Sequence, residues 1–342
     1  MGWIDRLPLG IQRRLRFEYW PYLFFYAPLY PYGIFLALRA RSFSYFTACN
    51  PNIRNSGAFE SSKYNVVKHI VPPFALKGVL LTENEIAEAL QLMAQEGLTF
   101  PLVAKPDVGE RGTGVEIIHT ADELRQYLSS ATELTILQEY TDLPLELGIF
   151  YHRYPWKDKG EITSIVMKDF LKVVGNGRST LRDLILDHIR AQKRLDYLLA
   201  KFASQLDRVL AVGEELLLEP IGNHARGTTF LNGNHLINDE LVAVFDKISS
   251  TIPDFYYGRF DIKTSSLPDL YAGHNIQVLE VNGVSSEPAH IYDPSTTIFE
   301  AYRALAQHFT IIYRISVANH KAGFPYTPLG RVLKDLRNHY SR

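Results

Sequence analysis

The sequence has only one cysteine, Cys49, among its 342 residues. An intramolecular disulfide is therefore impossible, and a zinc site built from several thiolates is excluded as well. The formal net charge is −1 at pH 7, so no strong overall field would attract nucleic acid. The chain also has no internal repeat and no low-complexity tract. These absences indicate a globular protein of a reducing compartment, expected in the cytoplasm, with no nucleic-acid partner.

Charged side chains are absent from residues 19–38, a stretch long enough to span a bilayer as a helix. Prolines interrupt the stretch, and arginines lie on both sides of it. Three arrangements stay open: two short helices joined near residues 28–31 and packed on the body, a hairpin in a membrane interface, or a true span. No small-residue cleavage site follows, so a removable signal peptide is not expected. Peripheral membrane contact through residues 13–41 is therefore one alternative. The residues concerned are Pro21, Pro28 and Pro31, and Arg13, Arg14, Arg16, Arg39 and Arg41.

Two common nucleotide-binding signatures are missing from the glycine-rich segment at residues 100–118. No Lys-Ser or Lys-Thr pair follows its last glycine, which excludes the P-loop, and the segment does not open a helix as a dinucleotide fingerprint would. Instead, a strand ends at Lys105, and Gly109, Gly112 and Gly114 precede a second strand. Glycines let the backbone approach an anion closely and turn its amides toward it. The segment indicates either a flap over phosphate groups or a plain β-hairpin.

Hard oxygen ligands occur in two short apolar segments near the end of the chain. Asp261 lies in GRFDIK, and Glu280 and Asn282 lie in VLEVNG. Residues two apart on a strand face the same side, so Glu280 and Asn282 can hold one cation, and Asp261 on an adjacent strand completes the set. Mg²⁺ usually binds one or two carboxylates together with substrate phosphates. The segments predict a Mg²⁺ site beside the glycine-rich loop, although either one alone also fits a solvated strand end.

Strands and helices alternate along the chain without a regular βαβ rhythm, which favours α+β layers over a doubly wound parallel sheet. Thr82, with Glu85 three residues later, is expected to cap a helix. The expected strands are 43–49, 101–105, 114–118, 136–140, 145–154, 162–174 and the two acidic segments. The expected helices are 60–70, 83–97, 121–130, 180–186, 236–252, 295–318 and a short one from Leu329.

Lys105, the glycine-rich loop, QEY at 138–140, Glu146, GRFDIK and LEVNG together resemble the ATP-grasp superfamily. Within it, the likeness is greatest to carboxylate–amine ligases related to D-alanine–D-alanine ligase, and it covers roughly residues 43–320. The resemblance implies an α+β ATP-grasp fold, in which two subdomains grip ATP, behind a short aromatic helical N-terminal segment. The implied division is an N-terminal segment 1–42, a reduced substrate subdomain 43–97, a lid 98–155, and a catalytic subdomain with tail helices 156–342.

The resemblance also implies roles for particular residues. Arg259 and Lys105 would be catalytic. Asp261, Glu280 and Asn282 would bind two Mg²⁺ ions, with Mn²⁺ as an alternative. Tentative substrate contacts are His224, Arg226, Glu287 and His290; His290 has no identifiable partner for a nucleophilic triad. ATP would be bound by Lys63, Lys105, Gly109, Arg111, Gly112, Thr113, Gly114, Glu139, Tyr140 and Glu146.

Two departures keep the substrate open. The phosphate loop GERGTGV lacks the paired serines of the D-alanine ligases, and residues 283–294 differ from the loop that helps to hold D-alanine. The expected activity is therefore ATP- and Mg²⁺-dependent ligation of a small-molecule carboxylate to an amine, on amino acids or peptides, through an acyl phosphate. The alternatives are a kinase-like phosphotransferase and a membrane-surface ATP-binding module without turnover.

Overall fold

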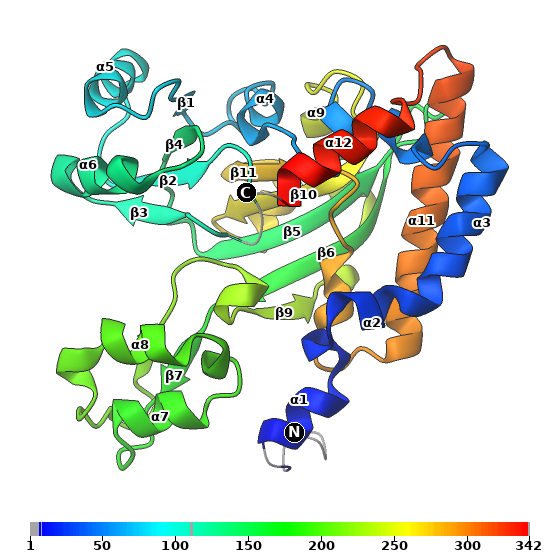
Figure 1. Ribbon diagram of the computed structural model, residues 1–342. Coiled ribbons are helices and arrows are strands. Elements are labelled where there is room, and N and C mark those ends of the chain that lie inside the picture. Colours follow the sequence, from blue (N-terminus) through cyan, green and yellow to red (C-terminus); the bar gives the residue numbers. More distant parts are fainter. Residues whose placement is uncertain (1–6, 8, 110–111, 341–342) are drawn as a thin grey trace.

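The computed structural model describes residue 7, residues 9–109 and residues 112–340 of the chain. Its centre is a five-stranded antiparallel sheet in the order β11-β10-β5-β6-β9 (Figure 1). A four-stranded antiparallel sheet has the order β1-β4-β2-β3, and β7 pairs with β8 separately. The α+β prediction is confirmed. The strands are β1 Gly78–Leu80, β2 Leu102–Pro106, β3 Glu116–Ile118, β4 Thr135–Glu139, β5 Leu145–His152, β6 Glu161–Asp169, β7 Lys172–Val174, β8 Glu215–Leu217, β9 Thr229–Asn232, β10 Tyr257–Thr264 and β11 Ile276–Asn282.

Helices cover both faces of the large sheet. Successive residues of a strand point to opposite faces, so Ile149 and Tyr151 of β5 pack in one core with Phe245, while Phe150 packs on the other side with Ile315. The helices are α1 Leu9–Leu15, α2 Tyr22–Tyr26, α3 Tyr30–Ala40, α4 Lys63–Val67, α5 Ile86–Glu96, α6 Ala121–Ser130, α7 Leu181–Asp187, α8 Leu195–Lys201, α9 Asp239–Ser249, α10 Leu267–Ala272, α11 Ile298–Lys321 and α12 Leu329–Tyr340.

Each smaller sheet has a hydrophobic core of its own. Helices α5 and α6 pack on the four-stranded sheet around Leu102 and Leu124. The pair β7-β8 packs with α7 and α8 around Leu181 and Leu198, and this unit is inserted between β6 and β9 (Figure 1). Strand β5, which falls within the expected lid segment, pairs with β10 and β6 in the large sheet.

The uncharged N-terminal stretch forms two short helices packed on the body, the first of the three arrangements considered. Helices α2 and α3 are joined by a 3-10 turn at Ala27–Leu29. Phe25 of α2 packs with Leu305, and Leu36 of α3 packs with Ile311, so both helices rest on α11 (Figure 1). Among the helices of the described residues, none is both long and apolar enough to cross a membrane.

Three local predictions are wrong. Residues 43–49 form no strand: a 3-10 helix at Tyr45–Ala48 packs against α11, and Thr47 Oγ1 donates to the carbonyl oxygen of Ser44, which favours the turn. The helix expected at 60–70 covers only Lys63–Val67, since Glu60 has a φ of 54°. Thr82 does not cap α5, whose N-cap is Glu85 without a side-chain hydrogen bond.

Candidate functional site

The acidic segments form adjacent strands at one edge of the large sheet. In the antiparallel register of β10 and β11, Asp261 lies opposite Glu280 and Arg259 lies opposite Asn282. Residues two apart on a strand share a face, and directly opposed residues share it too. All four side chains therefore lie on the same face, which the sequence predicted for Asp261, Glu280 and Asn282.

Asp261 is the centre of this group. The Arg259 guanidinium donates to both of its carboxylate oxygens, at 3.0 and 3.1 Å, and the Asn282 amide donates to Oδ2 at 3.2 Å. Lys168 Nζ of β6 lies 3.7 Å from Oδ1. Burial alone would raise the pKa of Asp261, but Arg259 and Lys168 hold that pKa below its ordinary value. The Asp261 carboxylate is therefore ionised, and a cation bound to it would share its oxygens with Arg259 and Asn282.

Glu280 meets a cation that comes from α4. Lys63 Nζ lies 3.2 Å from Glu280 Oε1. Ser62 caps the helix that carries this lysine, because its hydroxyl accepts from the backbone N–H of Asn65. Burial opposes ionisation of Glu280, yet Lys63 and Lys105 lower its pKa. The fold thus places Lys63 beside Glu280, one of the predicted metal ligands.

Lys105 is buried where the two sheets meet. Only 6% of its surface is exposed. Its ammonium donates to Gln138 Oε1 at 2.8 Å and to the carbonyl oxygen of Leu279 in β11 at 3.0 Å, both uncharged oxygens. Burial lowers the pKa of Lys105 to about 8, although the nearby charge of Glu280 acts in the opposite direction. A buried ammonium held only by neutral acceptors suits an anionic ligand.

Glu146 pairs with a lysine in this structure. Its Oε1 accepts from Lys168 Nζ at 2.7 Å, and both side chains are nearly buried. A Cβ added to Gly222 would collide with the same carboxylate, so residue 222 approaches Glu146 closely only because it is glycine. Glu146 therefore lies in the charged group around Asp261, joined to it by Lys168.

The oxygen donors fit a hard cation. Asp261 and Glu280 supply carboxylates and Asn282 an amide oxygen, which is the ligand chemistry of Mg²⁺. Among the described residues no three His, Cys, Asp or Glu side chains are grouped as a metal centre. The ion would consequently depend on ligand oxygens as well as on the protein, as Mg²⁺ bound with substrate phosphates does.

The glycine-rich loop is tied to the inserted unit. Gly112 and Gly114 both have a φ of 69°, in the left-handed region that favours glycine. Arg226 donates to the carbonyl oxygens of Gly112 and Val115, at 2.6 and 3.1 Å. Arg226 therefore anchors the loop. Thr113 is exposed, and Arg111 lies outside the described residues.

Residues 138–141 connect the two sheets. Gln138 donates to the carbonyl oxygen of Leu279, and Lys263 of β10 donates to that of Thr141 at 3.0 Å. Glu139 accepts from the backbone N–H of Lys77, and the Tyr140 ring lies 5.8 Å from Lys263 Nζ. The segment that contains Glu139 and Tyr140, two of the expected ATP contacts, is thus held against the acidic strands.

Glu287 is clamped by two phenols. The hydroxyls of Tyr26 and Tyr292 donate to its two carboxylate oxygens, the second at 2.6 Å. The guanidinium of Arg259 points at the Glu287 carbonyl oxygen, 3.5 Å away. Burial and the charge of Glu287 raise the pKa of Tyr26 well above its ordinary value, so the phenol stays a donor. Glu287 therefore presents a fixed carboxylate next to Arg259.

The two histidines proposed as substrate contacts are partly buried, and burial lowers the pKa of both. Burial lowers the pKa of His224 to about 3, and its ring lies between those of Phe230 and Tyr292. Burial likewise lowers the pKa of His290 to about 4, and its Nδ1 lies 2.7 Å from Ser164 Oγ. His224 thus packs against Tyr292, whose hydroxyl donates to Glu287.

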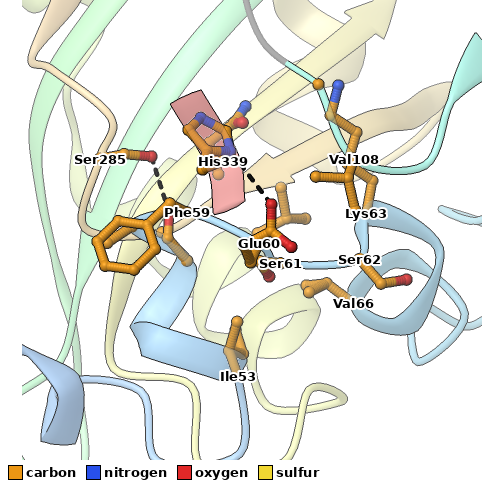
Figure 2. Close-up of a pocket in the computed structure, with 16 residues that line it drawn as sticks. Ile53, Phe59, Glu60, Ser61, Ser62, Lys63, Val66, Val108, Ser285 and His339 are labelled. Carbon is orange, nitrogen blue, oxygen red and sulfur yellow. Dashed lines mark hydrogen bonds and ion pairs between the residues drawn. The ribbon is translucent and has the colours of Figure 1, made fainter. Parts of the chain in front are cut away.

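A cavity of about 60 Å³ opens beside Lys63 (Figure 2). It lies between the segment leading into α4, the end of β11 and the last turn of α12. Gly109 and Asn282 line it, which places it between the glycine-rich loop and the metal ligands. Glu60 and His339 form one wall, 3.6 Å apart (Figure 2). The cavity therefore continues the predicted nucleotide and metal site.

Sequence reasoning missed two residues of the site. Gln138 holds the ammonium of Lys105, and Tyr26 holds Glu287 across 261 positions of sequence. The QEY segment gave a signal for Gln138, since it lies one position before the Glu139 that was considered. Nothing in the local pattern around Tyr26 indicated its partner.

No protein-family model and no curated protein matches the sequence. Among solved structures, D-alanine–D-alanine ligase from Bacillus anthracis is similar at 15% identity and a TM-score of 0.42, with 76% of this chain and 69% of that chain covered. VanG D-Ala:D-Ser ligase from Enterococcus faecalis is similar at 12% identity and a TM-score of 0.39, with 77% and 61% covered.

A bifunctional glutathione synthetase from Pasteurella multocida is similar at 16% identity and a TM-score of 0.37, over 70% of this chain. This chain spans only 34% of the length of that synthetase. Identities and TM-scores this low do not assign an activity to this chain.

Proposed function

We propose that this chain is an ATP-grasp ligase that uses ATP and Mg²⁺ to join a carboxylate to an amine, with release of ADP and phosphate. One observation carries the proposal. At one edge of the large sheet, two lysines lie together with three oxygen donors: Lys105 and Lys63 with Asp261, Glu280 and Asn282. The buried Lys105 and the partly buried Lys63 favour an anion, and the oxygen donors favour a hard cation. A nucleoside triphosphate bound together with Mg²⁺ provides both the anion and the hard cation.

Asp261, Glu280 and Asn282 would hold the ion, with Mn²⁺ as an alternative. When bound, Mg²⁺ would neutralise phosphate charge and orient the transferring group. Lys105 and Lys63 would bind phosphate oxygens, and the N–H groups of the glycine-rich loop would cover them. Residues 138–141 and Glu146 are the proposed contacts for adenine and ribose. Phosphoryl transfer depends mainly on such positioning and charge neutralisation.

Arg259 is the proposed catalytic cation. Asp261 fixes its guanidinium from two sides, so the group is preorganised and loses little freedom during reaction. Its Nη1 faces Glu287, where the acceptor would lie. A guanidinium there would stabilise charge that develops as a carboxylate attacks the γ-phosphate and as an amine then attacks the acyl phosphate.

Glu287 favours the ligase over the kinase alternative. A carboxylate held by two phenol donors has a fixed direction. Such a group suits the ammonium of an amino acid or peptide, which a kinase has no need to recognise. The proposed substrates are therefore amino acids or small peptides that carry a free amine.

The experiment that tests this function is a screen for ADP release with amino acids and dipeptides, alone and in pairs, followed by mass spectrometry of the products. We expect ADP release that requires both an acid and an amine. ADP with a stable phosphorylated product would identify the kinase alternative, and tight ATP binding without turnover the binding module. The Asp261→Asn protein is the negative control.

The pKa of Lys105 makes nucleotide affinity depend on pH. This pKa is lowered to about 8 in the free protein, and bound phosphates would raise it. Binding then takes up a proton above pH 8, so affinity should fall as pH rises, by about tenfold between pH 7.5 and 9.5. Calorimetric titration with a non-hydrolysable ATP analogue measures the effect. The Lys105→Met protein should bind more weakly and lose most of this slope; an unchanged slope in that variant would remove Lys105 from the phosphate site.

Replacing Tyr26 by Phe should weaken amine binding. The change removes one of the two donors that fix Glu287, so the KM of the amine should rise about tenfold with a smaller change in kcat. Steady-state kinetics with the substrates found in the screen tests this. Tyr302→Phe is the matched control, because that hydroxyl donates to the carbonyl oxygen of Phe25 in the same helix and does not contact Glu287. Equal effects of the two variants would reduce Tyr26 to a packing role.

A further inference from the structure

Helix α2 has two different apolar faces. Its inner face packs Phe25 and Tyr26 into the body, where both are at most 5% exposed. Its outer face exposes Leu23 and Phe24 by 72% and 63%, beside a half-exposed Tyr22. One packed face is sufficient to hold a short helix on a protein, so the outer residues need a second explanation.

Helix α3 repeats this arrangement. Leu36 and Ala37 are buried against α11, whereas Tyr30, Ile34 and Leu38, four residues apart, form an exposed stripe. We call the exposed apolar residues of this region the outer N-terminal face: Tyr22, Leu23, Phe24, Tyr30, Ile34, Phe35, Leu38 and Phe43. Single exposed apolar residues are ordinary, but a concentration like this on two successive helices marks an interaction surface.

The charges that the N-terminal segment itself places beside this face are all of one sign. The sequence has no Asp or Glu between Glu18 and Glu60. Arg39 and Arg41 are exposed at the end of α3, and the Arg39 guanidinium lies 5.8 Å from the Phe35 ring, at the edge of the face. Glu18 itself is buried and pairs with Arg190 at 2.8 Å, so it does not offset these cations. The face therefore complements an anionic surface.

Aromatic residues flanked by cations suit one such surface well. Tyr and Phe side chains enter the boundary between headgroups and acyl chains, and arginines attract anionic headgroups. A second copy of the chain fits less well, because a two-fold contact through this face would bring the arginines of both copies together. We propose that the outer N-terminal face docks on the surface of an anionic lipid bilayer. This proposal does not depend on the ligase function.

The test is co-sedimentation of the full chain with vesicles of phosphatidylcholine, with and without phosphatidylglycerol, at low and high salt. We expect binding that requires the anionic lipid and falls as salt rises. Replacing Leu23, Phe24 and Leu38 together by Ser should weaken binding at least about tenfold. Serine at Trp156, Val174 and Val212, which are also exposed but lie elsewhere, is the matched control and should leave binding unchanged.

A second variant covers the case in which the serine variant does not fold. Arg39→Gln with Arg41→Asn keeps the apolar residues, and Asn accepts the left-handed φ of 55° at position 41. It should weaken binding to anionic vesicles about thirtyfold. Failure of the unchanged protein to bind at low salt would overturn the proposal. So would a dimer in sedimentation velocity that the serine variant converts to monomer without any vesicle binding, which would assign the face to self-association.

Discussion

Glu280→Gln should lower kcat for ADP release by at least about a thousandfold at saturating Mg²⁺. Glu280 lies opposite Asp261 and partners Lys63, so in the proposed site it serves both the ion and the phosphate-binding lysines. Loss of a positioned cation costs several kcal/mol of transition-state stabilisation, and the isosteric amide keeps the packing. Steady-state kinetics over a range of Mg²⁺ concentrations measures the loss.

The control for this change is Glu161→Gln. Glu161 also lies on a strand of the large sheet and pairs with Lys157 at 2.7 Å, but both side chains are about half exposed. An exposed pair contributes about 1 kcal/mol or less, so stability and turnover should barely change. Wild-type turnover of the Glu280→Gln protein would contradict the metal site, provided that its thermal unfolding shows a folded protein.

Arg259→Lys should lower kcat about a hundredfold or more while nucleotide affinity changes little. Lysine keeps the charge but cannot make the two-sided contact with Asp261, so the cation would no longer point at the proposed acceptor position. An interaction that is used mainly in the transition state appears in kcat. Nucleotide titration and kinetics on the same preparation separate the two effects.

A matched Arg→Lys change is available at the surface. Arg208 pairs with Glu214 in the inserted unit, and Arg208→Lys should leave both kcat and affinity as in the unchanged protein. If Arg259→Lys instead weakened ATP binding with normal kcat, Arg259 would be a ground-state phosphate contact and the catalytic role proposed here would be wrong.

The centre of the site could be predicted because its geometry is local. Arg259 and Asp261, like Glu280 and Asn282, are two residues apart on a strand, and strand periodicity alone places each pair on one face. The α+β class also followed from local patterns. The helices expected at 121–130 and 180–186 also begin where local chemistry favours a start, since the Thr120 and Thr180 side chains each accept from the backbone of the first turn.

The parts that could not be predicted depend on tertiary packing. The contact between Tyr26 and Glu287 arises because α2 docks on α11, and no pattern near either residue encodes it. Residues 43–49 look like a strand in isolation but have no strand to pair with. Their backbone carbonyl groups accept hydrogen bonds from α11 instead: the Asn319 side chain donates to the carbonyl oxygens of Ala48 and Cys49.

The exposed faces of the N-terminal helices also could not be predicted from local sequence. The run of uncharged residues predicted apolar burial, and the inner faces of α2 and α3 supply it. Only the fold reveals that Leu23, Phe24 and Leu38 point away from the body. The sequence alone therefore could not separate packing on the protein from contact with a lipid surface, and the structure combines an inner packed face with an outer exposed one.

Transfer of a carboxylate oxygen to phosphate is the most direct test of the proposed ligase. The enzyme would be incubated with ATP, Mg²⁺ and a mixture of amino acids carrying ¹⁸O in their carboxylates, and the released phosphate analysed by mass spectrometry. Attack of a carboxylate on ATP followed by amine attack leaves one ¹⁸O in each inorganic phosphate, alongside ADP, and the Asp261→Asn protein should release none. Unlabelled phosphate, or ADP formed without free phosphate, would contradict the account.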